Sequence, residues 1–231
     1  MATYGCEVVD GGRYRLSFTV GGLLAEQGRA VASLMVGDAA VVTDDMLRDT
    51  DNSDMFATAE LLESARRYAV AENVLQIRTR AAGVRIVNEV IKRLSALTMG
   101  ELHCIADADT LQSDRRALMW VAMCRYYALV GEFAQEVLRE HFLIGTPTIT
   151  YGDYEHFMLG KAMWHPEIDD LSTSTSAKLR SNVFKAMAEA GLVNRADDTI
   201  IPSLLSREVT GILMRRPESF GFFPMRGQIS A

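Results

Sequence analysis

The segment from Ala117 to Leu129 constrains the fold more than any other part of the chain. Its apolar side chains point in nearly every direction around a helix, and a helix of that kind is buried centrally. Other segments repeat apolar residues at helical spacing, and no strand-length alternation occurs before residue 190. We therefore predict an all-α (predominantly helical) protein with this helix at its centre.

Apolar periodicity and capping residues predict the individual elements. Helices are expected over about 21–36, 54–71, 81–97, 175–190 and 204–216, with a short helix and an exposed loop in the acidic stretch 44–54. Thr98, Ser113 and Thr150 are expected to cap helices, and Gly131 is expected to kink or break the central one. Two apolar runs around the polar turn 194–198 predict a small β-hairpin, and the tail 220–223 should pack back onto the body.

The clearest break in the chain is Gly145-Thr146-Pro147-Thr148, because Pro147 disfavours helix at Thr146. After it, the order of helices followed by a hairpin is that of a winged helix-turn-helix. We predict an N-terminal helical domain over 1–145 and a C-terminal winged-helix-like domain over 146–231.

Composition argues against several classes of protein. The three cysteines show no CxxC spacing, and the four histidines show no metal-ligand spacing, so no metal is expected. Phosphate-loop, dinucleotide and nucleophile-elbow motifs are missing, so we expect no cofactor and no enzyme activity. The longest apolar run, Ala117 to Cys124, is far shorter than the about 20 residues that span a bilayer, so we expect a cytoplasmic protein without membrane contact.

The net charge of −6 hides an alternation of charge blocks along the chain. Residues 64–93 and 172–231 carry an excess of basic groups, whereas 1–63 and 94–171 carry an excess of acidic ones. Because salt screens charges beyond about 8 Å, an anionic protein can still bind a polyanion through a local basic face. The alternative is that the basic and acidic blocks pair with one another within the fold.

The first basic set lies in the segment 78–93. Arg78, Arg85 and Lys92 are seven residues apart, nearly two helical turns, and Arg80 and Arg93 flank them. This spacing predicts a row of phosphate contacts. The alternative is a solvated helix face on which Glu89 pairs with Arg85.

The second basic set lies on the helix that begins near Thr175 and on the hairpin after it. The predicted outward positions are Thr175, Lys178, Asn182 and Lys185, with Ser181 beside them and Arg195 in the hairpin turn. Hydroxyl and amide groups mixed with lysines are what a helix in the DNA major groove presents. The alternative is an ordinary polar helix face.

Five blocks of the sequence together resemble the BrxA family of BREX bacteriophage-exclusion systems. They are GGLLAEQGRAVASL (21–34), ENVLQIRTRAAGVRIVNEVIKRL (72–94), FAQEVLRE (133–140), TYGDYEHF (150–157) and TSAKLRSNVFKAMAEAGLV (175–193). The resemblance implies an N-terminal part similar to the antitermination factor NusB, a winged-helix-like C-terminal part, and double-stranded DNA binding without known enzymatic activity. It also implies other BREX components as partners, among them a methyltransferase, an ATPase and a phosphatase-like protein.

Carried onto this chain, the resemblance places two basic clusters within its matching blocks: Arg78, Arg80, Arg85, Lys92 and Arg93, and Lys178, Arg180 and Lys185. The acidic stretch 44–54 lies outside those blocks. We therefore expect a non-enzymatic DNA-binding accessory protein of phage defence that contacts mainly the phosphate backbone. The alternative is a protein-interaction scaffold whose acidic blocks dock basic partners and which does not itself bind DNA.

Overall fold

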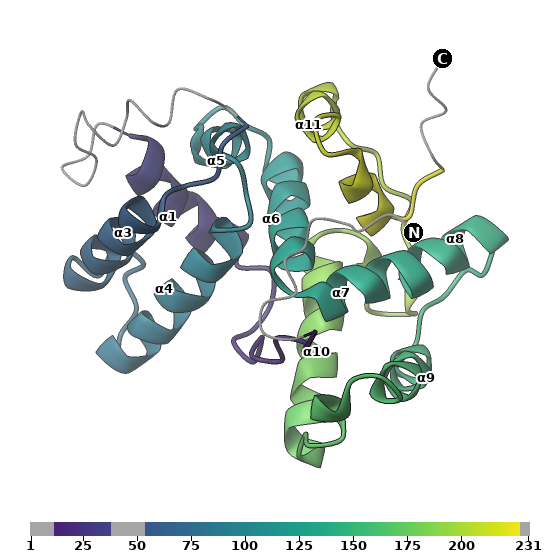
Figure 1. The fold of residues 1–231 in the computed structure, drawn as a ribbon. Coiled ribbons are helices and arrows are strands. Elements are labelled where there is room, and N and C mark those ends of the chain that lie inside the picture. Colours follow the sequence, from purple (N-terminus) through teal and green to yellow (C-terminus); the bar gives the residue numbers. More distant parts are fainter. Residues whose placement is uncertain (1–11, 38–53, 227–231) are drawn as a thin grey trace. The chain divides into compact units, whose positions relative to one another are not determined.

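The computed structural model describes residues 12–37 and 54–226 (Figure 1). The chain packs as two compact units, one formed by residues 24–122 and the other by 123–231 together with 1–23. We call them the 24–122 unit and the C-terminal unit. The boundary predicted at residue 145 falls inside the C-terminal unit, and the division into NusB-like and winged-helix-like domains stays a prediction. The expected short helix in the acidic stretch falls almost entirely outside the described residues.

The 24–122 unit is a helical bundle in which α1 packs against the other three complete helices. Its elements are α1 (Ala25–Val36), α3 (Ala59–Ala71), α4 (Arg80–Leu94), α5 (Met99–Ala106) and most of α6 (Gln112–Tyr126). Threonines 58, 79 and 98 each accept a backbone N–H at the start of a helix. Because Thr58 is the cap of α3, that helix starts at Ala59, five residues later than predicted. The predicted cap at Thr98 is confirmed.

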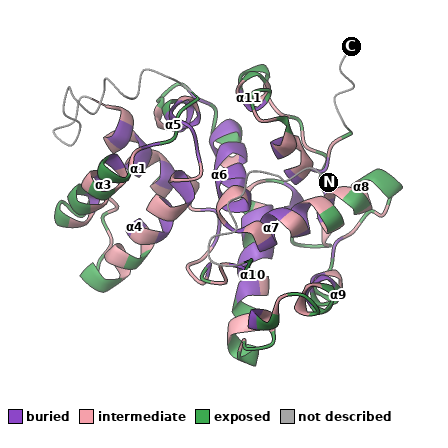
Figure 2. Cartoon of the chain, in the orientation of Figure 1, coloured by how far each residue is buried: buried purple, intermediate pink, exposed green. Residues whose placement is uncertain are grey.

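Helix α6 is buried nearly all round, as its apolar composition predicts (Figure 2). Every residue from Leu118 to Met123 is fully buried. Two details differ from the prediction. The helix already begins at Gln112, so Ser113 lies inside its first turn, where its hydroxyl is 3.4 Å from the Asp114 carboxylate instead of capping the helix.

The break after α6 falls at Tyr127, not at Gly131 as predicted. Tyr127 leaves the helical conformation, with φ −109° and ψ 92°, and α7 begins at the next residue. Gly131 lies within α7, where a Cβ atom would sit 2.8 Å from the carbonyl oxygen of Cys124. The glycine therefore allows close packing of the two helices rather than breaking one.

The C-terminal unit is mainly helical, with a small antiparallel sheet. Its elements are α7 (Ala128–Phe133), the π-helical turn η1 (Ala134–Arg139), α8 (Glu140–Ile144), α9 (Tyr151–Ala162), the 3₁₀ turn η2 (Pro166–Ile168), α10 (Thr173–Glu189), β1 (Val193–Asn194), β2 (Thr199–Ile200), α11 (Arg207–Leu213) and the 3₁₀ turn η3 (Pro217–Phe222). The predicted cap at Thr150 and the predicted burial of the tail at Phe222 and Phe223 are confirmed.

The predicted hairpin is present and gains a third strand-like segment. β1 and β2 are antiparallel, with Val193 opposite Ile200. On the other edge of β2, Ile200 N–H donates to Pro147 O at 2.8 Å and Ile149 N–H donates to Asp198 O at 3.0 Å. The segment that the sequence marks as a break, 147–149, thus pairs with β2, and the order across the sheet is 147–149, β2, β1.

The segment just after residue 17 lies against α10. The Asn182 side-chain amide donates to Phe18 O at 2.9 Å, and the backbone N–H of Leu23 donates to the Glu189 carboxylate. Gly22 has a left-handed φ of +71°, and a Cβ there would collide with that carboxylate. The turn predicted at Gly21-Gly22 therefore allows the chain to pass close to α10.

Replacing Gly131 by alanine tests the close approach of α7 to α6. The added methyl group meets a backbone oxygen that cannot move aside, so we expect the free energy of unfolding to fall by about 1–3 kcal/mol in urea denaturation. Gly211→Ala in α11 is the matched control, because a Cβ there meets nothing within 4 Å. It should leave stability unchanged or raise it by up to about 1 kcal/mol. Equal effects of the two substitutions would contradict the packing role of Gly131.

Candidate functional site

The first basic set surrounds the start of α4 in the 24–122 unit. Arg78 precedes the helix, Thr79 caps it, and Arg80 is its first residue. Arg78, Arg80 and Arg85 are exposed and Lys92 is half-exposed. None of these four side chains forms an ion pair with any described residue. The predicted seven-residue stripe holds within the helix only for Arg85 and Lys92, because Arg78 lies outside it.

Arg93 was predicted as a phosphate contact, and the structure contradicts this. Its side chain is only 1% exposed, and its Nε and Nη2 atoms donate to Glu89 Oε1 at 3.0 and 2.9 Å. Glu89 is equally buried, so the predicted alternative pair with Arg85 is also wrong. An i,i+4 pair in which each charge compensates the other can lie on the inward face beside Val90 and Leu94, where an unpaired charge could not.

On α10, an exposed stripe is formed by Lys178, Ser181 and Lys185. The opposite side of the helix is buried through Leu179, Val183 and Met187 (Figure 2). Lys178 pairs with no described carboxylate, whereas Lys185 Nζ lies 3.7 Å from Glu189 Oε1. The stripe therefore offers one free cation and one partly neutralised cation beside a hydroxyl group.

Two other α10 positions differ from the prediction. Ser172 caps the helix by accepting the Thr175 N–H at 3.2 Å, so Thr175 lies in the first turn. Its side chain is half-buried and not fully exposed as predicted. Asn182 was expected to face outward, but it is buried because its amide donates to Phe18 O. That carbonyl lies 164 residues away in the sequence, so helical periodicity alone could not reveal the contact.

Arg180 and Arg195 come together on the ring of Tyr151, at the start of α9. The Arg180 guanidinium lies 4.4 Å from the ring centroid and forms an ion pair with Glu155. Arg195 Nη2 donates to the Tyr151 hydroxyl at 3.3 Å. Sequence reasoning missed Tyr151 and Glu155, because no spacing links α9 to residues 180 and 195. Arg180 is two residues from Lys178, about 200° around the helix, and so lies off the exposed stripe.

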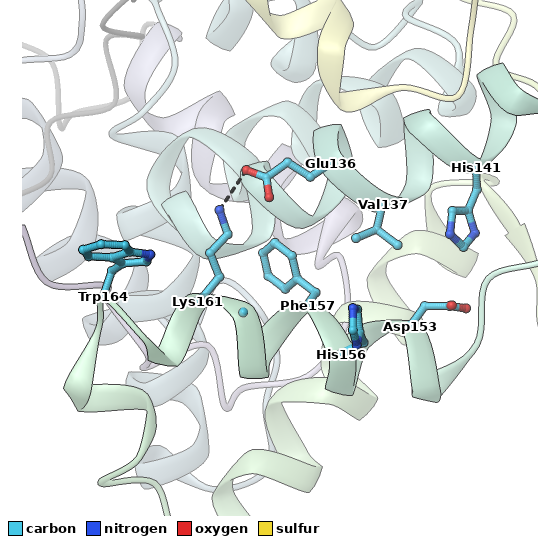
Figure 3. A pocket seen from close by; sticks show the side chains of 9 residues that line it. Glu136, Val137, His141, Asp153, His156, Phe157, Lys161 and Trp164 are labelled. Atoms are coloured by element: carbon cyan, nitrogen blue, oxygen red, sulfur yellow. Dashed lines mark hydrogen bonds and ion pairs between the residues drawn. The ribbon is translucent and has the colours of Figure 1, made fainter.

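A groove with a volume of about 560 Å³ lies between α9 and the helix formed by η1 and α8 (Figure 3). Its lining residues are Glu136, Val137, His141, Asp153, His156, Phe157, Gly160, Lys161 and Trp164. The His141 ring is held in place because its Nδ1 lies 3.1 Å from Thr148 O. No sequence spacing predicted this groove, although Leu159 and Met163 are one helical turn apart on the side of α9 away from Tyr154 and Phe157.

The described residues contain neither a metal-binding cluster nor a membrane-spanning helix. No cluster of three or more histidine, cysteine or acidic side chains in ranges 12–37 and 54–226 could hold a metal ion. Within the same ranges, every helix is too short or too polar to cross a bilayer.

The family model of BrxA matches residues 53–217 of the chain, which is more than half of its length. The chain belongs to the BrxA family. The BREX protein BrxA of Escherichia coli is 26% identical over 164 residues, which cover 70% of each chain. The BREX protein BrxA of Bacillus cereus is 26% identical over 126 residues, which cover 54% of this chain and 62% of that protein.

The BrxA match confirms the family that the sequence blocks predict. A crystal structure of an uncharacterised protein from Magnetospirillum magneticum shares the fold, with a TM-score of 0.66 and 20% identity over 90% of this chain and 96% of that one. The BrxA-matching region contains both basic sets and the groove, whereas the segment packed against α10 at residues 14–23 lies outside it.

In this BrxA-family chain, a buried carboxylate anchors the start of the described segment. Glu167 Oε1 accepts the Tyr14 N–H at 2.6 Å and lies 3.3 Å from His165 Nδ1, while the Tyr14 and His165 rings stack 3.9 Å apart. Burial by itself raises the pKa of Glu167. Hydrogen bonds from the backbone N–H groups of Tyr14 and Glu167, and from His165, outweigh burial and lower the pKa below the ordinary 4.5.

Replacing Glu167 by glutamine tests this anchor. Because the folded-state pKa is depressed, the carboxylate stabilises the fold above pH 4.5, and that contribution is lost as the pH falls through the lower folded pKa. We expect Glu167→Gln to lower the free energy of unfolding by about 1–3 kcal/mol at pH 7. The difference should shrink below pH 4.5 in denaturation curves. Glu72→Gln, at an exposed position, is the control and should stay within about 0.5 kcal/mol of the wild type.

Proposed function

We propose that this chain is a non-enzymatic accessory protein of a BREX phage-defence system that binds double-stranded DNA, mainly through the phosphate backbone. The observation that carries the proposal is the exposed stripe of Lys178, Ser181 and Lys185 on a helix whose opposite face is buried. A helix fixed in this way presents its polar stripe to a duplex without rearrangement of the fold.

The arrangement of the C-terminal unit supports this role. A helix that ends at Ile144 is followed by the strand-like segment 147–149, then α9, α10 and the hairpin. The segment 147–149 pairs with β2, the second strand of the hairpin, so that β2 lies between this segment and β1. This is the order of elements in a winged helix-turn-helix, in which the second helix of the motif enters the major groove. Here that helix would be α10.

The first basic set supports a second area of phosphate contact. Arg78, Arg80 and Arg85 are exposed and form no ion pair within the part of the chain that the structure describes. They therefore keep their full charge for a polyanion. Because Arg93 is buried, we assign the phosphate contacts of the 24–122 unit to those three arginines and to Lys92.

Binding by these side chains would select sequences weakly. Lysines and arginines that face phosphates carry no sequence information, and base edges are read by groups that fit into the grooves. Of the polar α10 side chains suited to reading bases, Ser181 is exposed and Asn182 is bonded to Phe18. We place Arg180 and Arg195 at the edge of the contact, since Tyr151 and Glu155 already hold them.

Within the defence system, the partners of this protein would be the other BREX components, including the methyltransferase, the ATPase and the phosphatase-like protein.

A salt titration of binding to a short duplex tests the proposal. Each phosphate contact contributes about −0.9 to the slope of log K against log salt. Lys178→Ala/Lys185→Ala should reduce the slope by about 1–2, and Arg78→Ala/Arg80→Ala/Arg85→Ala should reduce it further. Mobility shifts or fluorescence anisotropy measure both effects.

Arg66→Ala is the matched control for the salt titration. Arg66 is partly exposed, but its guanidinium already pairs with Glu63 at 2.6 Å, so its removal should leave the slope unchanged. No duplex binding by the folded wild type at about 50 mM salt would overturn the proposed function. An unchanged slope in Lys178→Ala/Lys185→Ala would remove α10 from the interface.

A further inference from the structure

Three large apolar side chains are exposed in the last turn of α9 and just after it. Leu159, Met163 and Trp164 are 72%, 78% and 80% exposed. Leu159 and Met163 are one helical turn apart and lie side by side, whereas Trp164 follows the end of α9 at Ala162 and lines the groove. Each of these side chains leaves most of its apolar surface exposed, and exposed apolar patches often mark binding surfaces. Tryptophan and methionine are enriched in protein interfaces.

The groove continues this patch. Figure 3 shows Trp164 at one end, with Phe157 and Val137 facing each other from the two helices that form the walls. Gly160 also lines the groove, and a Cβ atom built there meets nothing within 4 Å. The groove is therefore open at Gly160, and its volume of about 560 Å³ has room for several apolar side chains of a partner.

The charges around the groove are acidic. Glu136 and Asp153 line it, and Glu140 lies exposed one helical turn after Glu136. The cation among the lining residues, Lys161, pairs with Glu132 at 2.5 Å and with Glu136 at 2.8 Å. Burial by itself lowers the pKa of Lys161, but its bonds to the two glutamates raise the pKa overall, so it stays charged and neutralised. The groove thus keeps a surplus of negative charge.

These features determine which kind of molecule fits. A nucleic acid would bring phosphates next to Glu136 and Asp153, so the exposed tryptophan is not a base-stacking platform. A second copy of the chain in a two-fold contact would bring each acidic rim against the other, which is repulsive. A helix with an apolar face and basic flanks complements both the apolar lining of the groove and the acidic side chains around it, as in helix-in-groove recognition.

We propose that the groove between α9 and η1–α8, together with Leu159, Met163 and Trp164, binds an amphipathic helix of another protein whose apolar face is flanked by lysines or arginines. This surface is distinct from the exposed stripe of α10 and does not depend on DNA binding. The helix would seat apolar anchors about one turn apart over Trp164 and Phe157. Its basic side chains would reach Glu136, Glu140 and Asp153.

Tryptophan fluorescence of the full chain tests the proposal directly. The chain has two tryptophans, and because Trp120 is fully buried, changes in emission and in acrylamide quenching report on Trp164. The probe is a synthetic helical peptide with leucines at i, i+3, i+4 and i+7 and lysines on both flanks. We expect it to shift the emission of Trp164 to the blue and to protect it from quenching. A peptide with glutamates in place of the lysines should bind at least tenfold more weakly.

Variants distinguish this surface from general attraction to an anionic protein. Leu159→Glu/Met163→Glu alters exposed side chains, so the fold should be kept while peptide affinity falls at least tenfold. Leu204→Glu, at a position 96% exposed elsewhere in the same unit, is the matched control and should bind the peptide like the wild type. Duplex binding should be equal in both variants, so failure of this proposal can be told apart from failure of the proposed function.

Three results would overturn the proposal. One is equal binding of a scrambled peptide of the same composition, which would mean charge attraction alone. Another is an unchanged Trp164 signal at saturating peptide. The third is a concentration-dependent dimer in light scattering that Leu159→Glu/Met163→Glu abolishes, which would assign the surface to a second copy of the chain.

Discussion

Burial of one face of α10 decides which of its polar side chains reach solvent. Leu179, Val183 and Met187 face the core, and Asn182 is drawn inward by the carbonyl oxygen of Phe18. At 3.6 residues per turn, these contacts leave Lys178, Ser181 and Lys185 on the outside. The segment before residue 24 completes the constraint, because the Leu23 N–H binds Glu189 and thereby places a carboxylate beside Lys185. The basic surface therefore depends on packing within the C-terminal unit.

Local sequence signals predicted most of the elements, since their causes are local. Apolar spacing located α4, α6 and α10, and threonine side chains located the starts of α5 and α9. The predictions were wrong where the role of a residue depends on contacts with a distant part of the chain. Gly131 resembles a helix breaker in the sequence but is required by the carbonyl of Cys124, and Pro147 marks a break that the fold uses as a strand edge.

Side-chain placement was less predictable than the helices, for an electrostatic reason. On a helical wheel Arg93 and Lys92 are adjacent cations, and the pattern alone does not tell which one turns inward. The carboxylate of Glu89 decides this, because an arginine can be buried when a paired carboxylate accepts its N–H groups. Tyr151 acts in a similar way on Arg180 and Arg195, which sequence alone left as free cations. Pairing partners that lie far apart in sequence thus separate structural arginines from available ones.

This distinction also reconciles the net charge of −6 with the proposed binding of a polyanion. A phosphate within the screening length of about 8 Å responds to nearby unpaired cations and not to the total charge of the chain. Lys178, Arg78, Arg80 and Arg85 are unpaired among the described residues, whereas Arg66, Arg93, Lys161 and Arg180 are already neutralised. The acidic block 94–171 contributes the glutamates and the aspartate at the groove beside α9, where they repel phosphate and attract basic side chains. The C-terminal unit can therefore carry one surface that favours polyanions and another that favours basic partners. Each surface is defined by the charges that its own helices leave unpaired.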